Sequence, residues 1–204
     1  MGSPLSIMPG FDLWPGRLTL EAQGRLVDAV LVAITAAPLT HYATPQGKAM
    51  SVRMSAFGPL GWTSDAGGYR YVDRHPGTGR PWPPIPDTLL ALWAELGDPA
   101  TPPDSCLINL YRGVSRMGLH QDRDEADPAY PVLSVSLGDT AVFRIGGTAR
   151  KDPTRSLRLA SGDVCRLAGP ARLAFHGVDR ILAGSSSLVP GGGRINLTLR
   201  RAKP

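Results

Sequence analysis

The chain of 204 residues has few cysteines, few aromatic side chains and no long apolar run. Its two cysteines, Cys106 and Cys165, each lie inside an apolar segment, which argues against a disulfide framework or a thiolate metal site. The longest apolar stretch, residues 27–39, is too short and too interrupted to span a bilayer. The first ten residues lack the basic and apolar pattern of a secretory signal. We therefore expect a cytoplasmic protein without a membrane partner and with both cysteines as buried thiols.

Glycine, proline and positive charge are the abundant features. The 24 glycines and 20 prolines favour a turn-rich β architecture with helices in the minority. The 22 Lys and Arg against 17 Asp and Glu give a net charge of +5, which fits a polyanionic partner but is also common in soluble enzymes. The length suits one domain with a substantial core. A compact chain of this size needs no second protein to close a cavity, so we expect a monomer.

Two helices are predicted from apolar periodicity and capping residues. Thr19 is placed to cap a helix that runs to about Ala36, and Pro38 prevents its continuation. A second helix fits Asp87–Leu96, with Gly97 as its stop. Both helices should pack against one face of a sheet.

Short runs separated by turn signals predict the strands. Between the helices, the candidates are Met50–Met54 and Gly68–Val72. After Asp104 they are Leu107–Arg112, Val132–Leu137, Ala141–Ile145, Ser156–Leu159, Val164–Leu167, Leu173–Phe175 and Arg194–Arg200. Strands at this spacing favour a β-sandwich or jelly roll. The Gly- and Ser-rich segment 184–193 is interpreted as a flexible loop.

The last predicted strand separates polar from apolar residues. Alternation places Arg194, Asn196, Thr198 and Arg200 on one face and Ile195, Leu197 and Leu199 on the other. Two arginines on an edge strand are often simply solvated. Asn109 and Tyr111 alternate in the same way on a neighbouring candidate strand, however, and complete a set that suits a dicarboxylate such as 2-oxoglutarate.

Two histidines and an aspartate form a candidate metal site. His120 and Asp122 are two residues apart, so in extended structure they point to the same side, and His176 follows after enough chain for several strands. Two imidazoles and one carboxylate occupy one face of a ferrous ion and leave positions open for a cosubstrate and O₂. An isolated histidine near an apolar run is more often a core residue than a ligand. His41 and His75 lie in polar segments and are predicted to be surface residues.

These motifs resemble those of the AlkB oxidative demethylases. The resemblance covers about Thr44 to Arg201 and is carried by the segments MSVRMS, LGWTS, GYRYV, RPWPPIP, CLINLYRG, LHQDRDE, VLSVSLGD and RINLTLR. It implies a mainly β fold with flanking helices, in which a double-stranded β-helix (jelly-roll) core carries an N-terminal nucleotide-recognition lid. It further implies Fe(II) bound by His120, Asp122 and His176, O₂ as oxidant, and 2-oxoglutarate bound by Asn109, Tyr111, Arg194, Asn196 and Arg200. Two positions depart from the pattern, because Ile195 replaces an aromatic residue and Arg116 a lysine.

The resemblance also implies a set of nucleotide contacts. They are Thr44, Met54, Trp62, Tyr69, Arg116, Gln121, Arg123, Asp124, Glu125 and Arg150. A base methylated at a pairing ring nitrogen is cationic, so the Trp62 indole can stack on it with a cation-π component, and Asp124 or Glu125 can accept from the exocyclic amine. Without the resemblance, the favoured interpretation of Trp62 is a core residue and that of the acidic segment is a solvated loop.

The resemblance implies repair of 1-methyladenine and 3-methylcytosine in DNA, with RNA as a further substrate. The methyl group is hydroxylated and leaves as formaldehyde, while 2-oxoglutarate becomes succinate. The nucleic acid must be single-stranded or have its base flipped out. Two alternatives remain open, a dioxygenase acting on a peptide or small molecule and a non-catalytic nucleic-acid-binding module. We expect one domain, residues 1–204, with helices and lid in 1–97 and the catalytic jelly roll in 98–204.

Overall fold

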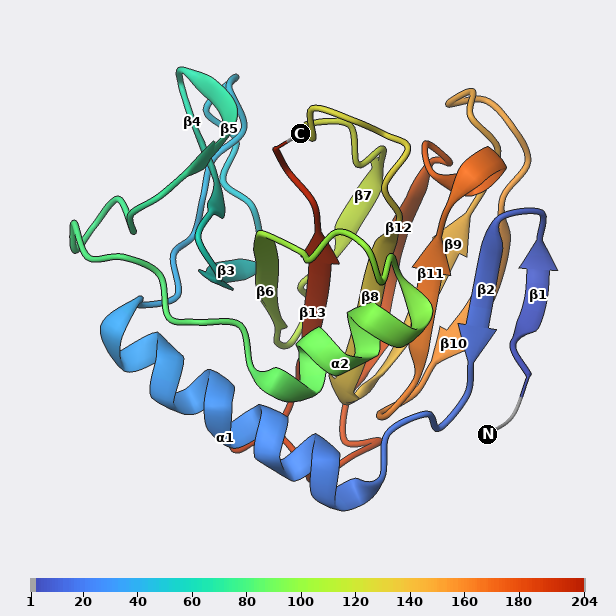
Figure 1. Cartoon of the computed structure of the whole chain (residues 1–204), viewed down its shortest axis with the longest axis horizontal. Coiled ribbons are helices and arrows are strands. Elements are labelled where there is room, and N and C mark those ends of the chain that lie inside the picture. Colours follow the sequence, from blue (N-terminus) through green and yellow to red (C-terminus); the bar gives the residue numbers. More distant parts are fainter. Residues whose placement is uncertain (1–2, 204) are drawn as a thin grey trace.

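The computed structural model describes residues 3–203, which form two antiparallel sheets and a separate hairpin (Figure 1). The larger sheet has the strand order β1 (Leu5–Met8), β2 (Phe11–Trp14), β11 (Val164–Leu167), β8 (Val132–Gly138), β13 (Arg194–Arg200), β6 (Ser105–Tyr111) and β3 (Arg53–Phe57). The smaller sheet has the order β10 (Arg155–Leu159), β9 (Thr140–Ile145), β12 (His176–Leu182) and β7 (Met117–His120). The hairpin consists of β4 (Gly61–Asp65) and β5 (Gly68–Val72). This two-sheet arrangement confirms the predicted jelly-roll class.

Both predicted helices are present with the predicted ends. Helix α1 spans Leu20–Ala36, and the Thr19 hydroxyl caps it by accepting the Ala22 N–H at 3.2 Å. Helix α2 spans Asp87–Leu96 and stops at Gly97, whose N–H donates to the carbonyl of Trp93. Within residues 3–203, neither helix is long and apolar enough to cross a membrane.

The helices lie against one face of the larger sheet, and the smaller sheet lies behind it (Figure 1). Because side chains alternate along the strands, the core is divided into one cluster on the helix side of the larger sheet and another between the two sheets. Ile108 of β6 and Leu197 of β13 pack toward the helices, whereas Leu107 joins the cluster between the sheets. Each such fully buried aliphatic side chain stabilises the fold by about 1.5–3 kcal/mol. The polar residues of the same two strands are thereby left facing the space between the sheets.

Several strand predictions need correction. Residues 173–175 are not a strand, because they follow a short 3-10 turn (Gly169–Ala171), and β12 begins only at His176. The predicted Met50–Met54 strand begins three residues later, as β3. Strands β1, β2, β4, β7 and β12 were not predicted, and β1, β2 and β7 have only four residues each, too few to establish a period. The remaining predicted strands are confirmed to within two residues at either end.

The segment 184–193 is anchored to the sheet, which differs from the flexible loop predicted from its composition. The carboxylate of Asp139 accepts from the N–H groups of Ser186 and Gly193 at 3.0 and 3.1 Å. Val189 is 3% exposed and belongs to the core on the helix side. Two apolar residues, Leu188 and Val189, and one buried carboxylate therefore hold an otherwise Gly- and Ser-rich segment in place.

The surface prediction for His75 is wrong, whereas His41 is exposed as predicted. His75 is 3% exposed, and its ring packs edge-on against Trp82 at 5.1 Å between centroids. Its Nδ1 accepts the N–H groups of Gly77 and Thr78, and its Nε2 lies 2.9 Å from the carbonyl of Pro38. The ring thus accepts hydrogen bonds from main-chain N–H groups of the turn at residues 75–79. His75 is therefore a structural residue near the hairpin β4–β5.

The first 97 residues contribute more than helices and a lid. Strands β1, β2 and β3 all belong to the larger sheet, where β2 pairs with β11 and β3 pairs with β6. The larger sheet therefore draws strands from both sides of the boundary expected at residue 97. The single-domain interpretation stays a prediction.

Candidate metal centre

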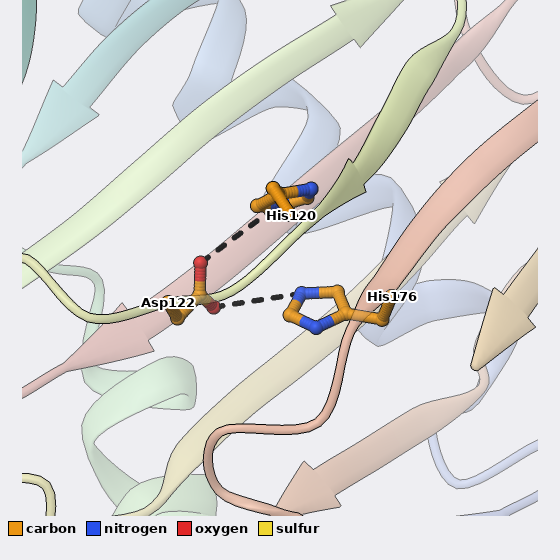
Figure 2. Close-up of side chains that lie close together, drawn as sticks. All are labelled: His120, Asp122 and His176. Atoms are coloured by element: carbon orange, nitrogen blue, oxygen red, sulfur yellow. Dashed lines mark ion pairs between the residues drawn. The ribbon is translucent and has the colours of Figure 1, made fainter. Parts of the chain in front are cut away.

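The two histidines of the predicted site come from neighbouring strands. His120 ends β7 and His176 begins β12, and the two residues are partners in the register of this antiparallel pair. Asp122 follows two residues after His120. Its Oδ1 lies 3.7 Å from His120 Nε2, and its Oδ2 lies 3.7 Å from His176 Nε2 (Figure 2). The three donor atoms all lie within 4.8 Å of one another, so one ion can contact all three.

Main-chain carbonyls fix the orientation of both imidazoles. His120 Nδ1 lies 2.9 Å from the carbonyl of Gly118, and His176 Nδ1 lies 2.9 Å from that of Ala174. A carbonyl can only accept, so each Nδ1 carries the hydrogen and each Nε2 presents a lone pair. Both imidazoles are therefore held in the tautomer that binds a metal through Nε2.

The charges at the site also suit a divalent cation. Burial, together with the neighbouring His120, lowers the pKa of His176 to about 4, so this imidazole is neutral near pH 7. Burial opposes ionisation of Asp122, but Arg200 and the two imidazoles outweigh it and hold the pKa of the carboxyl well below its usual range. Two neutral nitrogens and one carboxylate on one side of a cavity are the donor set of non-haem ferrous sites.

The metal triad opens into a cavity of about 70 Å³ between the sheets. A water molecule needs roughly 10–15 Å³ of such space, so this cavity has room for several water-sized groups. The lining includes apolar side chains from both sheets, Val132 and Leu167 from the larger and Phe143 from the smaller, together with the polar face of β6 and β13. The predicted cosubstrate residues Asn109, Tyr111, Arg194, Asn196 and Arg200 all line this cavity.

Arg194 has buried donors that no protein group satisfies. Its side chain is 1% exposed, and Nη2 donates to Ser136 Oγ at 2.9 Å and to Asn196 Oδ1 at 2.6 Å. The Nε and Nη1 atoms have no partner within the described chain. A buried guanidinium with free donors is expected to be matched by an anion, and a carboxylate accepts such a pair of donors in bidentate fashion. The two donors of Arg194 without a protein partner therefore support the fit of a dicarboxylate to this cavity.

Arg200 lies six residues further along the same face of β13 and connects the cavity to the metal triad. Its Nη2 donates to Asp122 Oδ1 at 2.8 Å. Its Nε lies 3.2 Å from Glu125 Oε1, a close ion pair without hydrogen-bond alignment. The two arginines thus bracket the cavity, one beside the metal ligands and one at the far end of the strand. Fold and site together define an iron- and 2-oxoglutarate-dependent oxygenase.

Comparison with known proteins gives the family. Residues 10–200 match the model of the 2OG-Fe(II) oxygenase superfamily. The chain is 74% identical over 203 residues to an alpha-ketoglutarate-dependent dioxygenase AlkB homolog of Caulobacter vibrioides, covering 100% of this chain and 92% of the relative. It is 39% identical over 190 residues to the alpha-ketoglutarate-dependent dioxygenase AlkB of Escherichia coli K12, covering 91% and 88%.

A solved structure, titled the structure of OsALKBH1, superposes with a TM-score of 0.84 at 29% identity, covering 98% of this chain and 100% of that one. The chain therefore belongs to the AlkB family of Fe(II)- and 2-oxoglutarate-dependent dioxygenases. Its cofactor set is Fe(II), 2-oxoglutarate and O₂, and the three-residue cluster is placed to bind the iron.

An aromatic group predicted to contact the nucleotide stands on the hairpin β4–β5, outside the cavity. Trp62 of β4 stacks on Tyr69 of β5 with ring centroids 5.4 Å apart and an interplanar angle of 20°. Its Nε1 donates to Asp124 Oδ2 at 2.8 Å, which fixes the indole beside the loop that follows Asp122. Tyr69 is 46% exposed, so the stacked pair is open to solvent at one end.

The other predicted nucleotide contacts differ in their accessibility. Arg116, Arg123 and Arg150 are exposed, whereas Met54 is 2% exposed within β3. Thr44 is half-buried and caps a short turn by accepting the N–H of Lys48. Gln121 is also half-buried, and its amide donates to the carbonyl of Leu173 at 2.7 Å.

The structure places Glu125 away from the position expected for a base contact. Its side chain is 2% exposed. Oε1 accepts from the Tyr71 hydroxyl and lies beside Arg200, and Oε2 accepts from Arg172 Nη2 at 3.0 Å. Because both oxygens are engaged by protein groups, Asp124 alone remains available to an exocyclic amine.

Besides Tyr71, sequence reasoning missed a second residue of this network, Arg172. It is 2% exposed and four residues upstream of His176. The signal available in the sequence is its setting, a single arginine in the apolar segment LAGPARLAF. A charged residue in such a run is expected to have a buried partner.

Proposed function

We propose that the protein removes methyl groups from the ring nitrogens of bases in DNA, with 1-methyladenine and 3-methylcytosine as substrates and RNA as a further substrate. The observation that carries this proposal is the Trp62 indole, held by Asp124 within two residues of the metal ligand Asp122. An aromatic plate beside a carboxylate suits a flat, cationic base, because the ring face attracts the charge and the carboxylate accepts from the exocyclic amine.

The chain's own residues bind and orient the reactants. His120, Asp122 and His176 would hold the iron, and Arg194 and Arg200 would hold the two carboxylates of 2-oxoglutarate. When bound, iron and 2-oxoglutarate supply the activation of O₂ that hydroxylates the N-methyl carbon, with release of succinate and CO₂. The hydroxymethyl group then leaves as formaldehyde, and the proton it loses restores the neutral base. The protein's contribution is to place the methyl group at the open side of the triad.

The base must leave its duplex stack to reach this position. The methyl group lies on the Watson–Crick edge, which pairing would cover, so the substrate is a single strand or a flipped nucleotide. Damaged bases pair poorly, and their extrusion is correspondingly less costly. The exposed arginines Arg116, Arg123 and Arg150 are candidate partners for the phosphates of that strand.

Oligonucleotides with a single methylated base test the proposal. The wild-type protein with Fe(II), 2-oxoglutarate and O₂ should lower the oligonucleotide mass by one methylene and release one formaldehyde per succinate. Asp122→Ala should abolish both products, and Trp62→Ala should lower kcat/KM by about 5- to 150-fold, the value of a stacking contact of about 1–3 kcal/mol. Trp62→Phe, which keeps a ring, should lose less. Wild-type protein that makes succinate but leaves every methylated oligonucleotide unchanged would contradict the proposal.

We also propose that a single chain acts in the cytoplasm. The cavity and its anchors are built from one chain, and both cysteines are free and buried, as suits a reducing compartment. Analytical ultracentrifugation at several protein concentrations tests this, because a monomer should give the mass of one chain at every concentration.

A further inference from the structure

Arg172 connects the segment before His176 to the loop after Asp122. Its guanidinium uses all three nitrogens. Nε donates to the carbonyl of Tyr130 at 2.7 Å, Nη1 donates to the carbonyl of Asp122, and Nη2 donates to Glu125 Oε2 at 3.0 Å. The side chain is 3% exposed and does not line the cavity, so its one direct contact with a metal ligand is the main-chain carbonyl of Asp122.

Glu125 stands between two arginines, and this makes the charge of Arg172 important for the cavity. Arg200 Nε lies 3.2 Å from Glu125 Oε1, while Arg200 Nη2 donates to the metal ligand Asp122. The buried group therefore contains two carboxylates and two guanidiniums and is neutral as a whole. Without Arg172, Glu125 would keep the Tyr71 hydroxyl as a donor and, among residues 3–203, Arg200 as its one cationic partner, and would compete with Asp122 and the cosubstrate for that guanidinium.

We propose that Arg172 is a positioning residue of the metal centre. By neutralising Glu125 it leaves Arg200 available to Asp122 and to a carboxylate of 2-oxoglutarate, and by holding the Asp122 carbonyl it fixes the main chain of a metal ligand. Groups that orient ligands in this way influence a metal site nearly as strongly as the ligands themselves. The inference concerns cosubstrate binding, so it does not depend on which methylated molecule the protein oxidises.

Calorimetric titration of 2-oxoglutarate into the Mn(II)-loaded protein tests the inference without relying on turnover. Arg172→Met keeps the length of the side chain and removes its charge, and we expect it to weaken 2-oxoglutarate binding by roughly 10- to 100-fold. Glu125→Gln removes the charge that Arg172 neutralises. The double variant should therefore bind 2-oxoglutarate within about 2-fold of Glu125→Gln alone, the scatter of additive effects. A residue that only supports the fold would not be rescued by removing its partner's charge.

A partly buried ion pair elsewhere in the larger sheet provides the control. Arg166 Nη2 donates to Asp12 at 2.7 Å, and its Nη1 donates to the carbonyl of Leu96, on the side of β11 away from the cavity. Arg166→Met should leave the affinity for 2-oxoglutarate unchanged. The proposal is overturned if Arg172→Met binds 2-oxoglutarate as wild type does, or if the double variant binds no better than Arg172→Met. Should thermal melting show that Arg172→Met does not fold, the comparison of the double variant with Glu125→Gln decides. Equal affinity then supports the proposal, and a further loss above about 10-fold overturns it.

Discussion

At the scale of single residues, the metal centre is preorganised by groups that never touch the metal. Two carbonyls select the tautomer of the histidines, and a buried arginine holds the aspartate that lies between them. Each of these partners comes from the strand or loop that carries the ligand, or from strand β13 of the other sheet. The geometry of the site is therefore fixed by the fold before any cofactor binds.

The neutral state of His176 predicts how the stability of the metal-free protein depends on pH. Its pKa is about 4 in the folded state against an ordinary value near 6.5, so the unfolded chain takes up a proton that the folded chain does not. The contribution of His176 to the free energy of unfolding is therefore complete above pH 6.5. It falls by up to about 3 kcal/mol as the pH drops toward 4. Urea unfolding followed by circular dichroism at pH 7, 6, 5 and 4 measures this loss.

Two histidine variants separate this effect from general acid unfolding. His176→Gln should lose this part of the pH dependence, whereas His41→Gln, which changes an exposed ring, should keep it. An identical pH dependence in His176→Gln and wild type would refute the assignment.

Both cysteines should be unreactive in the folded protein. Burial raises the pKa of Cys106 and of Cys165 to about 12, and the thiolate is the reactive form. We expect no adduct with iodoacetamide at pH 8 in native buffer and two adducts in guanidinium chloride, as read by mass spectrometry. Rapid single labelling of the native protein would show that Cys165, which lines the cavity, is reached through it.

Single-residue prediction succeeded where a residue type was rare and its spacing informative. The triad and the polar face of β13 were predicted because histidines are few and because alternation assigns every second residue to one face. Arg172 and the true partners of Glu125 were not, since these two residues are 47 positions apart and an ion pair over that distance leaves no local pattern.

At the scale of elements, the site depends on how closely β7 approaches β12. A Cβ added at Gly177 of β12 would lie 2.5 Å from the carbonyl oxygen of Met117 and 2.8 Å from that of Gly118, both in β7. Real Cβ atoms do not come this close to backbone, so the strand pair would have to separate. His120 and His176 face each other across this pair.

Gly177→Ala should therefore weaken Mn(II) binding by at least about 10-fold, because it displaces one histidine relative to the other. Gly118→Ala is the matched control on the partner strand, since a Cβ there meets nothing within 4 Å. Calorimetric titration of both variants with Mn(II) makes the comparison. Equal affinities would show that the strand pair tolerates the added methyl group.

Helices and strands were predictable where the sequence clearly marks the residues at which they begin and end. The helices carry a capping threonine and a terminal glycine, and both were placed correctly. The apolar run LAF before His176 was taken for a strand because composition alone cannot distinguish an extended run from a buried turn. The order of strands within the sheets is set by long-range pairing and has no counterpart in local sequence.

At the scale of the whole molecule, the positive charge should govern encounters with nucleic acid. The net charge is +5, and three exposed arginines lie among the predicted strand contacts. If these three residues each neutralise one phosphate of a single strand, the affinity should fall by roughly 20-fold between 50 and 200 mM salt.

Fluorescence anisotropy of a labelled oligonucleotide measures that salt dependence. The affinity for 2-oxoglutarate provides the internal comparison, because its arginines are buried and less screened by salt. An oligonucleotide affinity that does not change with salt would refute phosphate binding by these side chains.

The buried donors of Arg194 link the stability of the folded protein to the concentration of 2-oxoglutarate. That guanidinium is buried by the fold itself, so a dicarboxylate bound to it stabilises the folded state over the unfolded one, and occupancy raises the free energy of unfolding. A cell that runs short of the keto acid will hold a larger unfolded fraction of this protein for its proteases to find. The concentration of 2-oxoglutarate would then set the amount of folded protein as well as the catalytic rate of each molecule.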